Sequence, residues 1–440
     1  MNLRRLVSAA LAAFAFLVVV PASALAVDVQ TLAAAKGEQV WYVADHSLPM
    51  IAMSATLPAG SEYDPTDKAG LAAFAAALFD EGAGKLNAEA FKKAENDRGI
   101  QLSFQAGRDG ATVSLVTLSA NAREAFRLLG LALTHPRFDD SAIARVRAQI
   151  LAGLKQDSEN PSTVAARGFF RTFFHGHPYG HSVSGDAASV AAITRADLVA
   201  FARAHWTRGN IKIAVSGDVD ATTLKALIAD AFGALPDQAP PPVPMARNMG
   251  APGVHVMAMD VPQPNVVFGL PGLLRRDKDF IPAYVANYIL GGGGFSSRLM
   301  NDVREKRGLT YGISTSLVPM TKAGLWVGQV ATKKASVRET IKVMRQTIKT
   351  FAENGPTAKE LADAKTYLTG SLPLAFASNV GIASQLNVFQ TENMPVDYVE
   401  KRNALINAVT LDDVNRVARR LFDPSRLTIV VAGSMPKQGQ

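Results

Sequence analysis

The chain has 440 residues, of which 48% are apolar, and carries a formal net charge of +8. This composition is typical of a folded globular protein, and the length favours two or more domains. The absence of cysteine excludes disulfides, thiolate metal sites and cysteine nucleophiles, and the scattered distribution of the basic residues argues against a nucleic-acid partner.

Residues 1–26 are predicted to be a signal peptide. Arg4 and Arg5 precede an apolar run, residues 6–20, and residues 24–26 (Ala-Leu-Ala) fit a small-x-small cleavage site. Because the run is too short for a membrane span, we expect cleavage after it and export to the periplasm; an uncleaved anchor is the alternative. No later stretch predicts a transmembrane span. Loose association with a membrane stays open.

The segment 69–84 (AGLAAFAAALFDEGAG) predicts an alanine-rich helix. Asp67 is placed to cap its start, and Gly82 and Gly84 are placed to end it. Positions i, i+3 and i+4 share a helix face, so Ala73, Ala76 and Ala77 form one face that carries only methyl groups. Either another backbone packs closely against this face or chemical groups are missing from it.

The hairpin-like segment 101–119, with its Arg-Asp-Gly turn, predicts antiparallel strands. Three histidines follow at 175, 177 and 181 in the sequence HGHPYGH. They could bind Zn²⁺, but the glycines and the proline between them predict a loop without the rigid presentation that a helix gives. We therefore favour a structural loop near a substrate over a metal site.

The chain contains an internal repeat. Segments 193–217 and 409–433 both read as a Thr-capped helix, a turn, and an apolar strand closed by glycine. We therefore predict an α+β fold of two homologous domains, each a largely antiparallel sheet with helices packed on one face. The proline-rich residues 236–252 are a predicted linker between domains at 27–235 and 253–440.

The first candidate residues in the second half are a run of four glycines. Gly291, Gly292, Gly293 and Gly294, followed by Phe295, precede a predicted helix. The lysine of a phosphate-binding loop is missing, so a nucleotide site is disfavoured. We expect instead a flexible loop that lets another backbone approach closely, and these five residues are candidates for a substrate loop.

Arg298 and Tyr311 are the next candidates. Arg298 lies in the first turn of the predicted helix, and Tyr311 enters the next strand. Together they could polarise a peptide carbonyl, although a structural role for the pair is the alternative. Residues 304–307 (Arg-Glu-Lys-Arg) are typical of a solvated helix face.

Taken together, the residues resemble those of the insulinase or pitrilysin type of zinc peptidases, including processing-peptidase relatives. The resemblance covers nearly the whole mature chain. It depends on the duplicated halves, on residues 70–72 (Gly-Leu-Ala), on 177–180 (His-Pro-Tyr-Gly) and above all on 290–311 (LGGGGFSSRLMNDVREKRGLTY).

The resemblance also indicates what is missing. Active members carry H-x-x-E-H after the Gly-Leu-Ala opening, in which the two histidines bind zinc and the glutamate is the general base. Here Ala73, Ala76 and Ala77 stand at those positions, and Gly153 stands at the expected position of the third ligand. The resemblance therefore implies no zinc and no other cofactor in this chain.

In two-subunit members of this family, one subunit supplies the metal motif and the other supplies an arginine and a tyrosine that reach the substrate. The resemblance places Arg298 and Tyr311 in that role. It implies an exported non-catalytic subunit that pairs with an H-x-x-E-H zinc peptidase to cut peptides or unfolded polypeptides. The alternatives are a peptide-binding scaffold of the same fold and a self-sufficient hydrolase that uses the histidines at 175–181.

Overall fold

The computed structural model describes residues 28–34, 37–247 and 249–435. The predicted signal peptide lies outside these residues and stays a prediction. Among the helices in these ranges, none combines the length and the apolar character needed to cross a lipid bilayer.

The first half contains a six-stranded sheet in the order β1-β2-β8-β3-β7-β6, in which only the β2–β8 pair is parallel. Its strands are β1 (Gln30–Ala33), β2 (Gln39–Ala44), β3 (Met50–Leu57), β6 (Gln101–Ala106), β7 (Ala111–Leu118) and β8 (Lys212–Gly217). A short ribbon pairs β4 (Gly82–Ala83) with β5 (Leu86–Asn87). The helices are α2 (Leu71–Ala76), α3 (Ala88–Asn96), α4 (Ala122–Thr134), α5 (Asp140–Glu159), α6 (Pro161–Phe173), α7 (Ala187–Ala192), α8 (Arg195–His205) and α9 (Ala221–Phe232).

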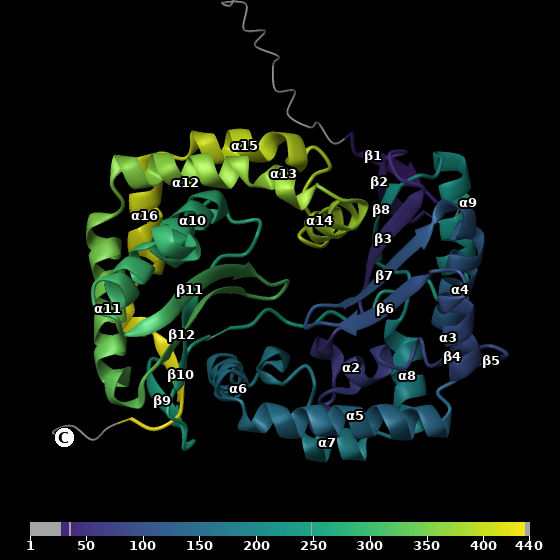
Figure 1. Ribbon diagram of the computed structural model, residues 1–440, viewed down its shortest axis with the longest axis horizontal. Coiled ribbons are helices and arrows are strands. Elements are labelled where there is room, and N and C mark those ends of the chain that lie inside the picture. Colours follow the sequence, from purple (N-terminus) through teal and green to yellow (C-terminus); the bar gives the residue numbers. More distant parts are fainter. Residues whose placement is uncertain (1–27, 35–36, 248, 436–440) are drawn as a thin grey trace, which may run out of the picture.

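The second half contains a five-stranded sheet in the order β11-β12-β10-β13-β9, in which only the β13–β9 pair is parallel. Its strands are β9 (Gly253–Met257), β10 (Asn265–Pro271), β11 (Thr310–Pro319), β12 (Gly324–Thr332) and β13 (Thr428–Ala432). The helices are α10 (Phe280–Asn287), α11 (Val337–Asn354), α12 (Ala358–Gly370), α13 (Leu372–Ala375), α14 (Asn379–Thr391), α15 (Tyr398–Ala408) and α16 (Leu411–Leu421). Figure 1 shows the two halves side by side.

The predicted α+β duplication is confirmed, and the repeat is visible in local detail. The α8–β8 unit and the α16–β13 unit both begin with a capping box, Thr194 with Asp197 and Thr410 with Asp413. Both units end at a glycine with almost the same left-handed backbone, because Gly217 has φ 142° and Gly433 has φ 144°. The same residue types therefore stand at the start and the end of both units.

Each half covers one sheet face with its own helices, as predicted, but the other face is packed in a way that the sequence did not reveal. Helix α14 of the second half packs on β8, β3 and β2 of the first sheet, and α6 of the first half packs on β13 and β10 of the second (Figure 1). Two buried or half-buried hydrogen bonds fix α14 there, from Ser216 Oγ to Asn379 Oδ1 and from Thr56 Oγ1 to Asn387 Oδ1, each 2.6 Å long. The halves are therefore joined by an exchange of helices.

The residues described within 236–252 contain neither helix nor strand, in keeping with their prolines. The second half of the segment is nevertheless anchored by backbone hydrogen bonds. The Ala246 N–H donates to the Lys322 carbonyl over 3.0 Å, and the Gly250 N–H donates to the Phe173 carbonyl over 2.9 Å. This connection runs against the protein surface between the two sheets.

Candidate functional site

Helix α2 carries the alanine face, and a buried carboxylate fixes its start. Gly70 adopts φ 95°, and the Gly70 and Ala72 N–H groups each donate to the Asp64 carboxylate over 2.8 Å. These donors lower the pKa of Asp64, but burial outweighs them and raises it to about 7. The predicted cap, Asp67, lies instead in a preceding turn of 3₁₀-helix, so that prediction is wrong.

The helix is also shorter than predicted. It ends at Ala76 rather than at Gly82, which begins the β4 ribbon. Ala77 closes the last turn through its N–H, which donates to the Ala73 carbonyl over 3.0 Å. Beyond this point the chain turns, and Phe79 packs in the aromatic core with its ring centroid 4.0 Å from that of Trp206. Tertiary packing therefore overrides the helix propensity of the alanine run.

The three aligned alanines are not equally buried. Ala76 is only 1% exposed, whereas Ala73 and Ala77 are partly exposed. Methyl groups cannot ligate a cation, so the residues present do not fit a catalytic zinc ion. Nowhere in the described parts of the chain do three or more His, Cys, Asp or Glu side chains gather in a way that could hold a metal.

Helix α5 packs beside α2 and carries Gly153. Gly153 is exposed, and a Cβ built on it would meet no other atom within 4 Å. Two arginines of α5 contact α2 and the turn that follows it. Arg145 forms an ion pair with Glu81, and Arg147 places its guanidinium 5.4 Å from the centre of the Phe74 ring. In this structure α5 packs against α2.

The histidine loop joins the two halves. His177 shares a 3.0 Å hydrogen bond with the Pro244 carbonyl and accepts the Tyr179 N–H over 3.2 Å. Burial lowers the pKa of His181, which favours its neutral form, and the charge of His177 adds to the effect. The loop is structural, as favoured from the sequence. Its proximity to a substrate stays a prediction.

Tyr179 is the centre of this contact. It is completely buried, donates to Asp109 in the β6–β7 turn, and accepts the Lys322 N–H of the β11–β12 turn over 3.0 Å. Asp109 also accepts the Thr321 N–H over 3.0 Å. Beside them, burial and the charge of Asp109 raise the pKa of Glu62 to about 7. Hydrogen bonds of Tyr179 therefore join two hairpin turns, one from each half.

The first two glycines of the second half are closely packed rather than part of an open loop. Gly291 and Gly292 end a turn of π-helix, Tyr288–Gly292, that continues α10. A Cβ on Gly291 would overlap Thr315 Oγ1, and one on Gly292 would lie 2.7 Å from Asn287 Nδ2. Thr315 in turn donates to Asn287 Oδ1 over 2.8 Å, in a buried network. The close approach is therefore as expected. The nearest atoms belong to side chains, but the Thr315 backbone carbonyl oxygen also lies 3.4 Å from a Cβ on Gly292. The expected flexible loop is wrong at these two positions.

Gly293 and Gly294 make the turn that follows. The Gly293 N–H donates to the Tyr288 carbonyl over 2.7 Å, and a Cβ on Gly293 would lie 2.8 Å from that same oxygen. A backbone group does approach Gly293, as expected, but it comes from the preceding helical turn and not from a separate segment. Gly294 has φ 56° and open space around it, and it begins a short 3₁₀-helix, Gly294–Ser296. A role of these glycines toward a substrate stays a prediction.

Arg298 is engaged inside the protein. Its Nε and Nη2 atoms donate to the two Glu360 carboxylate oxygens over 2.7 Å each, and Nη2 also donates to the Gly355 carbonyl over 2.9 Å. Burial would raise the pKa of Glu360, but hydrogen bonds from Arg298 and from Thr357 lower it to about 2. This bidentate ion pair ties the helix that follows the glycines to α12.

Tyr311, by contrast, is 84% exposed at the start of β11, where the register against β12 shifts. It lines a pocket of about 330 Å³ together with Arg304 and Lys333. Phe295 is 69% exposed, and its ring centre lies 4.7 Å from the Arg304 guanidinium carbon. Arg298 shares no hydrogen bond with Tyr311 and does not line this pocket. The arginine that lines this pocket with Tyr311 is Arg304, which forms an ion pair with Glu305 and was predicted to lie on a solvated face.

Comparisons with known proteins decide the family. The family model described as Insulinase (Peptidase family M16) matches residues 40–187, and the one described as Peptidase M16 inactive domain matches residues 192–368. A crystal structure of a peptidase M16 inactive domain from Pseudomonas fluorescens is 32% identical, with a TM-score of 0.88 over 93% of this chain and 99% of that one. The chain belongs to the insulinase family, peptidase family M16. The resemblance seen in the sequence is thereby confirmed.

Other M16 relatives agree with this assignment. A non-peptidase homolog, YmxG, from Helicobacter pylori is 25% identical over 90% of this chain and 92% of its own length. An uncharacterized zinc protease from Streptomyces coelicolor is 31% identical over 62% of this chain and 61% of its own length. A protease structure from Helicobacter pylori, at 18% identity and a TM-score of 0.83 over 92% of this chain and 99% of that one, shares the fold. The relatives thus include proteins named as zinc proteases and one named as a non-peptidase.

By these matches the chain is an inactive-type M16 member, and the alanine face gives the physical reason. Ala73, Ala76, Ala77 and Gly153, where the resemblance seen in the sequence expects the metal ligands and the general base, carry methyl groups or no side chain at all. The second half has an exposed pocket at Tyr311. The described residues therefore combine an alanine face without metal ligands in the first half with accessible polar side chains in the second.

Proposed function

We propose that this chain is an exported, non-catalytic subunit of a zinc endopeptidase. A partner subunit with H-x-x-E-H supplies the metal and the general base, and this chain contributes contacts to the peptide. The observation that carries the proposal is the contrast between the alanine face of α2 and the exposed tyrosine of β11. Tyr311 is 84% exposed and lines a pocket together with Arg304, so its hydroxyl group is accessible to a peptide that binds from outside.

In this proposal Tyr311 donates its hydroxyl hydrogen to the peptide carbonyl at the bond to be cut, and Arg304 binds a neighbouring carbonyl or a carboxylate of the substrate. Arg298 positions the segment from within through Glu360, rather than touching the substrate. A single donor to a developing oxyanion is worth about 10²–10³ in kcat. This sets the size of the effect that an experiment must resolve.

The test mixes this chain with an M16 subunit that carries H-x-x-E-H and measures peptide cleavage separately and together. Activity that appears or rises strongly on mixing supports the proposal. Tyr311→Phe should then lower kcat without changing the melting temperature, and Tyr367→Phe, at another exposed tyrosine, is the matched control. Turnover equal to that of the zinc subunit alone would contradict a shared active site.

The second candidate is a peptide-binding or structural scaffold of the same fold. The non-peptidase name of the Helicobacter relative favours it. Under this alternative, Tyr311→Phe and Arg304→Gln leave the turnover of any partner peptidase unchanged, and the chain binds unfolded polypeptide without a zinc subunit. The mixing experiment therefore separates the two candidates.

A further inference from the structure

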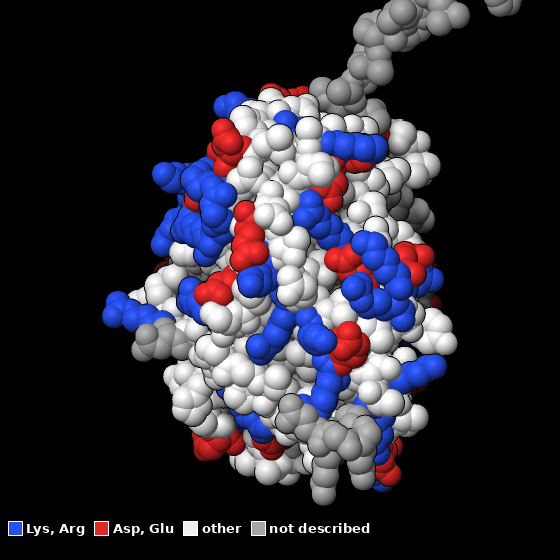
Figure 2. Space-filling view, turned by 90° about the vertical axis from the view of Figure 1, so that its left-hand side faces the viewer, with Lys and Arg blue, Asp and Glu red and all other residues white. Residues whose placement is uncertain are grey.

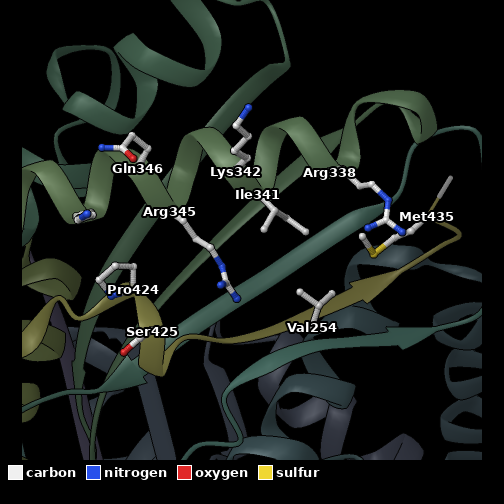
Figure 3. Close-up of a pocket in the computed structure, with 10 residues that line it drawn as sticks. Val254, Arg338, Ile341, Lys342, Arg345, Gln346, Pro424, Ser425 and Met435 are labelled. Atoms are coloured by element: carbon white, nitrogen blue, oxygen red, sulfur yellow. The ribbon is translucent and has the colours of Figure 1, made fainter. Parts of the chain in front are cut away.

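A basic groove lies on the outer side of the second half, between α11 and the edge strand β9. It has a volume of about 530 Å³ and is lined by Val254, Arg338, Ile341, Lys342, Arg345 and Lys349, among others. Figure 3 shows Arg338 and Arg345 pointing from α11 toward the sheet with Ile341 between them. Figure 2, which views the molecule from the α11 side, shows many Lys and Arg side chains on this face.

Three cations of α11 are weakly neutralised within the described chain. Lys342 and Lys349 each have one acidic neighbour, Glu339 and Glu353, at 3.8 Å and largely exposed. The Nε atom of Arg345 is buried and has no hydrogen-bond partner among the described atoms. The positive charge of the lysines and arginines that line the groove favours an anionic occupant.

The sheet side of the groove offers backbone groups as well. Among the described strands, β9 pairs only with β13, and it does so in parallel. The Gly253 N–H donates to Leu427 and the Met257 carbonyl accepts from Gly433, so these odd-numbered residues face β13. The backbone N–H and C=O groups of Val254 and Val256 therefore point away from the sheet. Their side chains are 40% and 47% exposed.

An open strand edge with exposed valines is a template for another strand. The alternation of strand side chains places Val254 and Val256 on the face that meets α11. A strand added at β9 would place every second side chain on this same face, about 7 Å apart. Arg338 and Arg345 are separated by seven residues of helix, or about 10.5 Å along its axis, which two such side chains can reach.

We propose that this groove binds an extended segment of another protein, which pairs with β9 and carries acidic side chains at alternate positions. The acidic side chains contact Arg345 and Arg338 on the face that meets α11, and the side chains between them turn to the opposite face of the sheet. The inference is independent of the proposed peptidase role, because it uses neither the alanine face nor Tyr311.

The test uses fluorescein-labelled pentapeptides and fluorescence anisotropy on the full mature chain at low salt. The alternating peptide Val-Glu-Val-Glu-Val should bind at least fivefold more tightly than the block peptide Glu-Glu-Val-Val-Val, which has the same charge, and Val-Lys-Val-Lys-Val should not bind. Arg345→Glu should weaken binding at least tenfold. Lys225→Glu on α9, an exposed lysine of the other half, is the matched control and should leave the affinity unchanged.

A second variant tests the strand edge itself. Val256→Pro removes an N–H that points away from β13, so the native ladder keeps its bonds while the added strand loses one. It should weaken the alternating peptide at least fivefold with a melting temperature close to that of the unchanged protein. Equal binding of the alternating and block peptides would overturn the proposal. A protein that binds anionic phospholipid vesicles but not the peptides, and whose vesicle binding is unchanged by Val256→Pro, would also overturn the proposal. The groove would then be a membrane-binding surface.

Discussion

Restoring a carboxylate to the alanine face should destabilise the protein, and the cost should depend on pH. Ala76 is 1% exposed and packs in the core of the first half, with no described metal-binding group around it. Overpacking by the longer side chain costs about 1–3 kcal/mol, and an unpaired buried carboxyl costs about 1–3 kcal/mol more. Ala76→Glu should therefore lower the free energy of unfolding by about 2–6 kcal/mol.

Burial raises the pKa of such a glutamate, so the folded state would bind a proton that the unfolded state releases above about pH 4.3. Stability relative to the unchanged protein then falls as pH rises, by about 1.4 kcal/mol per unit until the raised pKa is passed. For a folded-state pKa near 7, the penalty at pH 8 exceeds that at pH 5 by about 2–3 kcal/mol.

Urea unfolding followed by circular dichroism at both pH values gives these free energies. Ala73→Glu is the matched control, because this neighbour on the same face is partly exposed and its carboxylate can stay in water. A loss below about 1 kcal/mol for Ala76→Glu at both pH values would refute the reasoning, since a loss that small is below the expected cost of overpacking alone.

Three further predictions follow from the ion pairs and buried groups. Arg298→Met should raise the pKa of Glu360 from about 2 and lower the free energy of unfolding by about 1–3 kcal/mol above pH 5. A depressed pKa gives stability that is lost on acidification, so the free energies of unfolding of the variant and the unchanged protein should converge as pH falls toward 2. Parallel acid-titration curves of the two proteins would contradict this. The effect of Glu62→Gln on the free energy of unfolding should be more favourable at pH 8 than at pH 5 by about 2–3 kcal/mol. A carboxyl group whose pKa is raised to about 7 in the folded protein lowers the stability of that protein as pH rises from about 4.5. Equal effects of the substitution in urea unfolding at both pH values would exclude this. Tyr179→Phe removes the acceptor of the Lys322 N–H, so the hydrogen of that amide should exchange with solvent faster. Unchanged protection of the Lys322 amide from exchange would argue against Tyr179 as the residue that joins the two hairpin turns.

The duplication was predictable because its signals are local. A threonine cap, its aspartate three residues on and a terminal glycine act within one helix and one strand, and both copies keep them at Thr194 and Thr410. The exchange of α6 and α14 was not predictable in the same way. An amphipathic helix shows that it has an apolar face, but not which of two homologous sheets that face will cover.

The candidate site was predictable in part for a related reason. The loss of metal ligands could be seen in the sequence, because alanine excludes ligation wherever it lies. The choice between Arg298 and Arg304 required coordinates, since both lie on the segment before β11 and both have long side chains. Only the structure shows that Glu360 holds Arg298, while Arg304 reaches the pocket at Tyr311.

The exchanged helices also set an order of events during synthesis. Ser216 and its partner Asn379 are 163 residues apart in the chain. At 5–20 residues per second, the ribosome needs roughly 10 to 30 s to make that stretch. For that time the face of the first sheet that carries Trp41 has no α14 to cover it. We therefore expect a nascent chain that is arrested before residue 379 to aggregate where the completed chain does not.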